Sequence, residues 1–296
     1  MAWQEIDFHG KAAWELKAGT YRMVVVSGMG PRIGFWGRTD RENLLFRDTE
    51  GRARNEWQLA GGHRVWPIRP EADESEDAYR PDNDPCEVAR AGEELVVTAP
   101  TDPVLQTRRG IRVRRLGDDR VSVTSFISNV GDMLYSAGVW ALTCTQPAEG
   151  RTYGIPLGDG SDWDCFRYTI FKRWGGHTAR VNDPQINLTE KMLIVTPEGV
   201  ETKRMIEAPQ GITAMNAPDQ ETTFVKKAAY DRTARYPLGC NLAFYIGPDN
   251  FMVEMESMGP ERTLKPGETI SLEEIWVLTD SAVGLENAER LVGLFD

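Results

Sequence analysis

The chain has 296 residues, of which 41% are hydrophobic and 27% are charged, and its formal net charge is −11. This composition is typical of a folded globular protein, and the negative average field repels phosphate backbones and anionic lipid headgroups, so nucleic acid and membranes are not expected partners. No stretch approaches the roughly 20 apolar residues of a membrane helix, and the first residues lack the basic and apolar regions of a signal peptide. We therefore expect a cytoplasmic protein.

Short runs with the alternating or β-branched composition of strands recur along the chain, and each is bounded by Gly, Pro, Asn or Asp. In chain order they include residues 21–26, 94–98, 111–114, 121–127, 191–196, 199–205, 242–246, 251–256 and 270–278. Only residues 283–295 show a helical pattern, with Ser281 as the predicted N-cap. Since no linker or fixed-period repeat divides the chain, we predict a single all-β domain over residues 1–296, built from two large antiparallel sheets packed face to face.

Arginines are concentrated between residues 108 and 115. Arg112 and Arg114 alternate with Ile111 and Val113, and this alternation predicts a strand with one solvated face. We interpret the cluster as an exposed strand face and not as a nucleic-acid site.

The glycine-rich segment Gly28-Met-Gly-Pro-Arg-Ile-Gly34 differs from a dinucleotide-binding loop, because its third glycine comes one position late and Pro31 lies inside it. It is interpreted as a tight turn between strands. The four cysteines form no C-x-x-C pair, and neither His63 nor His177 has a partner at metal-ligand spacing. The sequence predicts no cofactor and no metal, although a His/Asp site assembled from distant segments stays open.

The richest polar segment runs from residue 61 to residue 85, where four prolines and two glycines fix the backbone. We interpret this segment as a stiff loop. A loop that mixes aromatic, acidic, amide and guanidinium groups suits a sugar, because rings stack on the apolar faces of the sugar and polar groups bind its hydroxyls. The candidate side chains are His63, Arg64, Trp66, Arg69, Asp82 and Asn83. The alternative is a structural segment in which Trp66 is core, the arginines pair with acids, and Asp82 and Asn83 cap turns.

A second candidate lies in the late strand Phe251-Met-Val-Glu-Met-Glu256. In an extended strand Glu254 and Glu256 point to the same face. If that face is semi-enclosed, burial raises the pKa of a carboxyl group toward the range useful for proton transfer. The alternative is a solvent-facing pair of ordinary surface acids.

A third candidate is the segment Arg173-Trp-Gly-Gly-His177, which resembles a loop tip that presents Trp174 and His177 to a ligand. A packed hairpin with a surface histidine explains the same residues equally well.

The order of these motifs resembles the galactose mutarotase-like superfamily, and most of all a little-characterised bacterial branch of it. The resemblance covers roughly residues 15–280 and is strongest in Gly61-Gly-His-Arg-Val-Trp66 and in the segments Pro266-Gly-Glu268 and Glu274-Ile-Trp276. It implies an antiparallel β-supersandwich whose concave face binds a pyranose.

The resemblance also implies acid/base chemistry, since mutarotases use a glutamate as base and a histidine as acid to open and reclose the sugar ring. By position Glu256, or Glu254 before it, would be the base, and Arg64 or Arg69 would hold hydroxyls. The mid-chain histidine of mutarotases is missing from residues 137–143, so His63 or His177 would have to substitute through space. Trp66, Trp140 and Trp174 are the candidate stacking surfaces.

Three functions remain open on this evidence, all with a small sugar or sugar derivative as the partner. The favoured one is an aldose 1-epimerase or mutarotase-like enzyme. The alternatives are a sugar-binding protein without catalysis and a glycoside hydrolase or lyase, which would use a pair of carboxyl groups.

Overall fold

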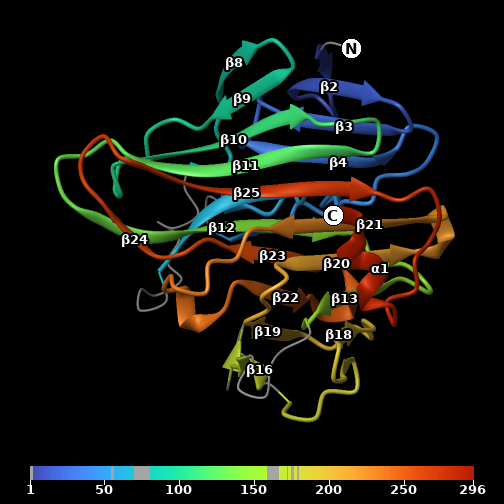
Figure 1. Cartoon of the computed structure of the whole chain (residues 1–296). Helices are drawn as coiled ribbons and strands as arrows, with labels where there is room; N and C mark the ends of the chain where they lie inside the picture. The colour runs from blue at the N-terminus through green and yellow to red at the C-terminus, as the bar shows by residue number, and fades with distance from the viewer. Residues whose placement is uncertain are drawn as a thin grey trace.

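The computed structural model describes residues 3–54, 57–69, 81–158, 167–171, 173–174, 177–178 and 180–296. In this part of the chain two large sheets pack face to face (Figure 1). The strand pairs within them are antiparallel. The predicted all-β, antiparallel sandwich is confirmed.

The first sheet, which we call the large sheet, has eleven strands in the described part of the chain. Their order is β1 (Gln4–Asp7), β2 (Ala12–Ala18), β3 (Tyr21–Val26), β4 (Arg32–Arg38), β7 (His63–Ile68), β12 (Tyr135–Thr145), β23 (Val253–Met258), β22 (Leu242–Ile246), β19 (Thr202–Ile206) and β14 (Tyr168–Ile170), with β24 (Arg262–Leu264) also paired to β12.

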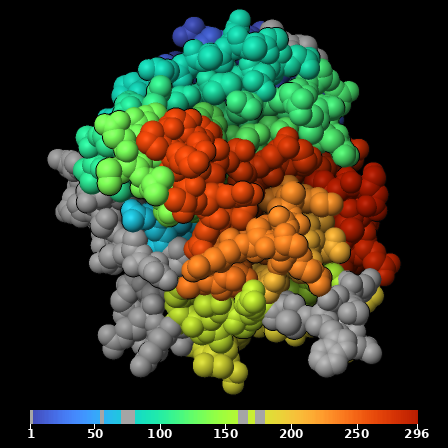
Figure 2. Space-filling model, turned by 60° about the vertical axis from the view of Figure 1, so that its left-hand side comes forward, coloured from blue at the N-terminus to red at the C-terminus, as the bar shows by residue number. Residues whose placement is uncertain are grey.

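The second sheet has ten described strands. Their order is β17 (Ile186–Leu188), β18 (Met192–Val195), β13 (Thr152–Pro156), β20 (Ile212–Ala217), β21 (Thr222–Ala228), β25 (Thr269–Leu278), β11 (Arg120–Asn129), β10 (Thr107–Arg115), β9 (Glu94–Thr98) and β8 (Glu87–Ala91). Two small hairpins join β5 (Ala53–Arg54) to β6 (Trp57–Gln58) and β15 (Arg173–Trp174) to β16 (His177–Thr178). Figure 2 views the side on which the segments coloured orange to red, from the last quarter of the chain, come to the surface below the green ones.

The core lies between the two sheets because side chains alternate along each strand. In the large sheet Val65, Ala141 and Met255 point inward, and in the second sheet Val123 and Trp276 meet them. The same alternation leaves Arg112 and Arg114 exposed on β10, beside buried Ile111 and Val113, as the sequence predicts. For Arg109 the predicted exposed face is wrong, because this side chain is 2% exposed and forms an ion pair with buried Asp102.

The C-terminal helix is much shorter than predicted. The structure has α1 over Ala288–Val292, followed by a 3-10 turn over Gly293–Phe295, and the N-cap is Asn287, whose side chain accepts a hydrogen bond from the Arg290 N–H. Ser281 and the residues up to 287 are not helical, and the apolar spacing that predicted a helix there comes from Val283 and Leu285, which fill a small cluster against the second sheet. No helix in the described ranges is long and apolar enough to cross a bilayer.

Two successive glycines place the start of β7, the strand that carries the richest polar segment. Gly61 and Gly62 have φ values of +81° and +75°, a region that side-chain-bearing residues rarely adopt. A Cβ atom on Gly62 would lie 2.4 Å from the Ile33 carbonyl oxygen of β4. The close approach of these backbones therefore requires glycine.

We predict that Gly62→Ala lowers the free energy of unfolding by more than about 2 kcal/mol, because it adds a backbone clash to the cost of a left-handed conformation. Gly267→Ala is the matched control: Gly267 has a φ of +82° but open space around its Cβ position, so only the conformational cost of about 1 kcal/mol applies. Chemical denaturation of the two variants measures the difference, and equal losses would contradict the clash.

Candidate functional site

Five neighbouring strands in the middle of the large sheet, β7, β12, β23, β22 and β19, carry polar and aromatic side chains on the face that points away from the second sheet. We call this the outer face. The strand register places Cys144, Glu254, Tyr245 and Lys203 in one row, and Arg64, Leu142, Glu256, Ala243 and Met205 in the next. Of the residues between these positions, Phe244 and Met255 belong to the core between the sheets. Side chains from five distant segments therefore meet on one surface.

Glu254 forms a buried ion pair with an arginine from a strand two places away. Its Oε1 accepts a hydrogen bond from Arg64 Nη2 at 2.8 Å, and Cys144 Sγ lies 3.4 Å from the same oxygen. Arg64 also donates to Cys144 Sγ at 3.2 Å, and it lies over the ring of Trp66 with its guanidinium carbon 4.4 Å from the ring centre. Glu254 and Arg64 are only 6% and 2% exposed, so the pair is shielded from water.

Glu256 lies deeper and has two donors. Its Oε1 accepts from Lys203 Nζ, and its Oε2 accepts from Trp140 Nε1 at 2.7 Å. Burial raises the pKa of this carboxyl group, while the Lys203 ammonium and these hydrogen bonds oppose the rise. Glu254 and Glu256 share a face as the alternation predicts, and their burial excludes ordinary surface acids.

A small residue makes the contact between Lys203 and Glu256 possible. The two residues stand on β19 and β23, which flank β22, so their side chains must meet above β22. The β22 residue opposite Glu256 is Ala243, and the one opposite Lys203 is Tyr245. The methyl group of Ala243 leaves space for the lysine stem to cross diagonally and reach the carboxylate.

Three tryptophans form an aromatic patch beside the two carboxylates. Trp66 makes edge-to-face contacts with Trp140 at 5.9 Å and with Trp57 at 5.6 Å between ring centres. Lys203 Nζ lies 5.0 Å from the ring centre of Trp140, a cation–π distance. Trp66 and Trp140 are 4% and 7% exposed and belong to a buried cluster on the outer face, so the predicted alternative, in which Trp66 is a core residue, describes Trp66.

Asp82 and Asn83 hold the segment beside this patch. Asp82 Oδ2 accepts from the buried Arg32 at 3.0 Å and from Trp57 Nε1 at 3.1 Å. Asn83 exchanges two hydrogen bonds with the backbone of Gln58. These contacts anchor Asn83 to a segment 25 residues earlier in the chain, whereas the predicted alternative was a turn cap.

Arg69 does not reach the carboxylates. It follows the end of β7, five residues after Arg64, and its guanidinium lies over the ring of Tyr135, 5.6 Å from the ring centre. The side chains of Trp174 and His177 lie outside the described part of the chain, and the backbone there pairs as β15 and β16. Neither the loop tip nor the packed hairpin is tested by this pairing.

The prediction that His63 shares a cleft with the glutamates is wrong. His63 precedes Arg64 on β7 and so points to the opposite face, into the layer between the sheets. There its Nδ1 lies 2.9 Å from Thr143 Oγ1 and its Nε2 lies 3.3 Å from Ser125 Oγ, and the ring is fully buried. Burial lowers the pKa of His63 to about 3, so the ring is neutral at ordinary pH.

A lysine–glutamate pair shares this interior layer with His63. Lys226 Nζ forms an ion pair with Glu274 Oε1 at 2.8 Å and donates a hydrogen bond to Thr143 Oγ1 at 2.9 Å, and both charged groups are fully buried. Burial raises the pKa of a carboxyl group, but the Lys226 ammonium and neighbouring donors lower that of Glu274 below its usual value. We call His63, Thr143, Lys226 and Glu274 the inner polar cluster.

Comparisons by sequence match no family model and no curated protein. Solved structures do match. A protein from Synechocystis sp. PCC 6803 is 16% identical, with a TM-score of 0.63 over 93% of this chain and 99% of that one. A galactose mutarotase-like protein from Lactobacillus casei is 11% identical, with a TM-score of 0.61 over 90% and 100% of the two chains. A candidate aldose 1-epimerase from Escherichia coli K12 is 12% identical, with a TM-score of 0.59 over 90% and 98%.

The chain has the galactose mutarotase-like fold. At these identities the likeness concerns the fold, and the site must be argued from its own residues. Within this mutarotase-like fold, sequence reasoning missed Lys203, which no local motif marks and which reaches Glu256 only because β19 and β23 lie on either side of β22. The position of His63 follows from a pattern in the sequence. Side chains alternate along the strand His63-Arg-Val-Trp66, so His63 points to the opposite face from Arg64 and Trp66.

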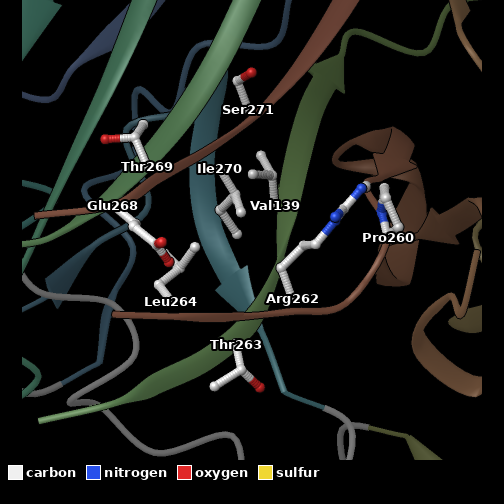
Figure 3. A pocket seen from close by; sticks show the side chains of 10 residues that line it. Val139, Pro260, Arg262, Thr263, Leu264, Glu268, Thr269, Ile270 and Ser271 are labelled. Atoms are coloured by element: carbon white, nitrogen blue, oxygen red, sulfur yellow. The ribbon is translucent and has the colours of Figure 1, made fainter. Parts of the chain in front are cut away.

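The described chain also has a groove of about 500 Å³ elsewhere in the mutarotase-like fold, between β24 and the first residues of β25. Figure 3 shows Val139 and Ile270 side by side in its floor, with Arg262 reaching toward Pro260. Its lining contains neither an aromatic ring nor a pair of carboxylates. The outer face therefore remains the candidate site.

We predict that His63 makes the protein sensitive to acid. The pKa of His63 is 6.5 in the unfolded chain and about 3 in the folded one. As the pH falls below 6.5, only the unfolded chain takes up the proton, so the free energy of unfolding of the protein decreases. The loss reaches about 2.5 kcal/mol between pH 7 and pH 4.5. The negative charge of Glu274 raises the pKa of His63, whereas the positive charges of Lys226, Arg64 and Arg32 lower it further.

The measurement is the free energy of unfolding of wild type and His63→Gln at several pH values. The difference between the two proteins isolates His63 from other groups that titrate in acid. Parallel curves between pH 7 and pH 4.5 would contradict a buried neutral histidine.

Proposed function

We propose that the chain binds a sugar or sugar derivative on the outer face and interconverts its anomers, with Glu256 as the base. The observation that carries the proposal is the buried Glu256 carboxylate, whose pKa is raised by burial and which Trp140 and Lys203 hold in place. A carboxylate tuned in this way takes up a proton more readily near neutral pH than an exposed one does.

The surroundings of Glu256 suit a sugar. Trp66 and Trp140 place indole rings of the kind that stack on sugars beside Glu256, and both rings are buried, at 4% and 7% exposed. The Arg64–Glu254 pair supplies both donors and acceptors of the kind that bind hydroxyls. The mutarotase-like names of several solved structures with this fold agree with this choice of ligand.

The proposed reaction needs two proton transfers. Glu256 removes the proton of the anomeric hydroxyl, the C1–O5 bond breaks as the ring oxygen takes up a proton, and C1 becomes an aldehyde carbon. Rotation about the C1–C2 bond and attack of the ring oxygen on the other side of C1 give the opposite anomer. Trp140 Nε1 keeps one carboxylate oxygen oriented, and the lone pairs not used by Trp140 and Lys203 remain to accept the proton.

A sugar-binding protein without catalysis is the second candidate. It is favoured by the place of His63, since the expected acid points into the interior and away from the outer face. Hydrolysis or lysis is less well supported, because Glu254 and Glu256 rise from one strand and approach a ligand from the same side, whereas glycosidases use carboxyl groups that flank the scissile bond.

The test is the rate of anomer interconversion, followed by NMR on freshly dissolved sugars and sugar phosphates. We predict that wild type accelerates it for at least one sugar and that Glu256→Gln lowers kcat at least about 100-fold with little change in affinity, because an amide cannot serve as the base. Glu5→Gln, at an exposed position on β1, is the control and should match wild type.

Binding of the same sugars is measured by tryptophan fluorescence, since Trp66 and Trp140 lie in the site. Binding without acceleration would favour the second candidate. Absence of both binding and acceleration across the panel would overturn the proposal.

A further inference from the structure

We propose that Lys203 is the proton donor to the ring oxygen, in the role for which the sequence suggested a histidine. This inference rests on the proposed function and names the second group of its chemistry.

The reaction requires the acid and the base to lie next to each other. The anomeric oxygen and the ring oxygen are bonded to the same carbon, so the group that removes a proton from one and the group that donates a proton to the other must converge on adjacent atoms. Lys203 and Glu256 meet this requirement, since the ammonium donates directly to the carboxylate.

The position of the Lys203 ammonium is fixed from several sides. The residue stands on β19, which is paired to β14 and β22, and its side chain is 2% exposed. It crosses above Ala243 and lies over the Trp140 ring, and Trp140 in turn donates to the other oxygen of Glu256. Acid, base and a stacking surface thus form one connected unit.

Other described donors on the outer face fit the role less well, because of what they contact or because they do not release a proton. An arginine does not release its proton in proteins, which excludes Arg64. Burial raises the pKa of the Cys144 thiol, and its contact is with Glu254. The Tyr245 hydroxyl donates to Glu201 at 2.7 Å. Among the histidines whose side chains the structure describes, His63 faces the interior and His9 is exposed after β1.

The proton balance closes within the pair. Ring opening moves the anomeric hydroxyl proton to Glu256 and a proton from Lys203 to the ring oxygen, which leaves a neutral carboxylic acid and a neutral amine. Ring closure to either anomer reverses both transfers, because the amine takes the proton of the attacking hydroxyl and the acid returns one to the aldehyde oxygen. The two groups end as they began, and no other reactant is needed.

The Lys203→Arg variant tests whether Lys203 donates a proton or only forms an ion pair with Glu256. Arginine keeps the positive charge beside Glu256 but does not release a proton, so we expect kcat to fall at least about 100-fold while sugar affinity and the melting temperature change little. Lys17→Arg, at an exposed surface position on β2, should behave as wild type.

Chemical rescue gives a second readout that a structural role would not produce. In Lys203→Ala, added ethylammonium should restore part of kcat, and the restored rate should depend on pH as the amine titrates, whereas ethylguanidinium at the same concentration should restore none. A purely electrostatic partner would be replaced equally well by both cations.

The outcomes distinguish this inference from the function on which it rests. If wild type accelerates anomer interconversion but Lys203→Arg keeps at least half of kcat, or if ethylguanidinium rescues as well as ethylammonium, Lys203 is not the acid and the proposed function stands. If wild type accelerates no sugar of the panel, the proposed function and this inference fall together.

Discussion

The alternation of side chains along β7, β12 and β23 is the constraint on which the rest of the molecule depends. On these three strands one set of side chains builds the outer face, with Arg64, Trp140 and Glu256, and the other set enters the interior, with His63 and Thr143. A shift of one residue in register would exchange the two sets. The inner polar cluster and the candidate site therefore lie on opposite faces of the same paired strands. Both depend on the register in which β12 pairs with β7 and β23.

Charge neutralisation is the second constraint. Taking ions out of water is costly, and a buried charge is tolerated only when a partner and hydrogen bonds replace the lost hydration. On the outer face Arg64 pairs with Glu254 and Lys203 pairs with Glu256, and in the interior Lys226 pairs with Glu274. Each ion pair joins strands that are distant in sequence. The two charged groups of a pair therefore meet only when the strands are paired in the native register.

Sequence alone predicted what depends on local pattern. The strand over 242–246 and the shared face of Glu254 and Glu256 follow from alternation within a few residues. His63 was assigned to the site because its segment was treated as a loop, whereas it begins a strand. Lys203 lay within a predicted strand without any motif, and its contact depends on the order β19, β22, β23, which crosses distant parts of the chain. The C-terminal helix was predicted to be longer than it is, because helical spacing of apolar residues also arises in irregular segments that pack on a sheet.

The place of β23 in the middle of the large sheet has a consequence for how such proteins diversify. β23 is hydrogen-bonded along both edges, to β12 and β22, so the backbone beneath Glu254 and Glu256 is among the most restrained in the molecule. The loops that connect the strands at the rim of the sheet are not restrained in this way, and they tolerate changes in sequence and length. A scaffold of this kind can exchange the groups at the rim while the two carboxylates keep their geometry. Under the proposed function, the choice of ligand can therefore evolve independently of the carboxylates.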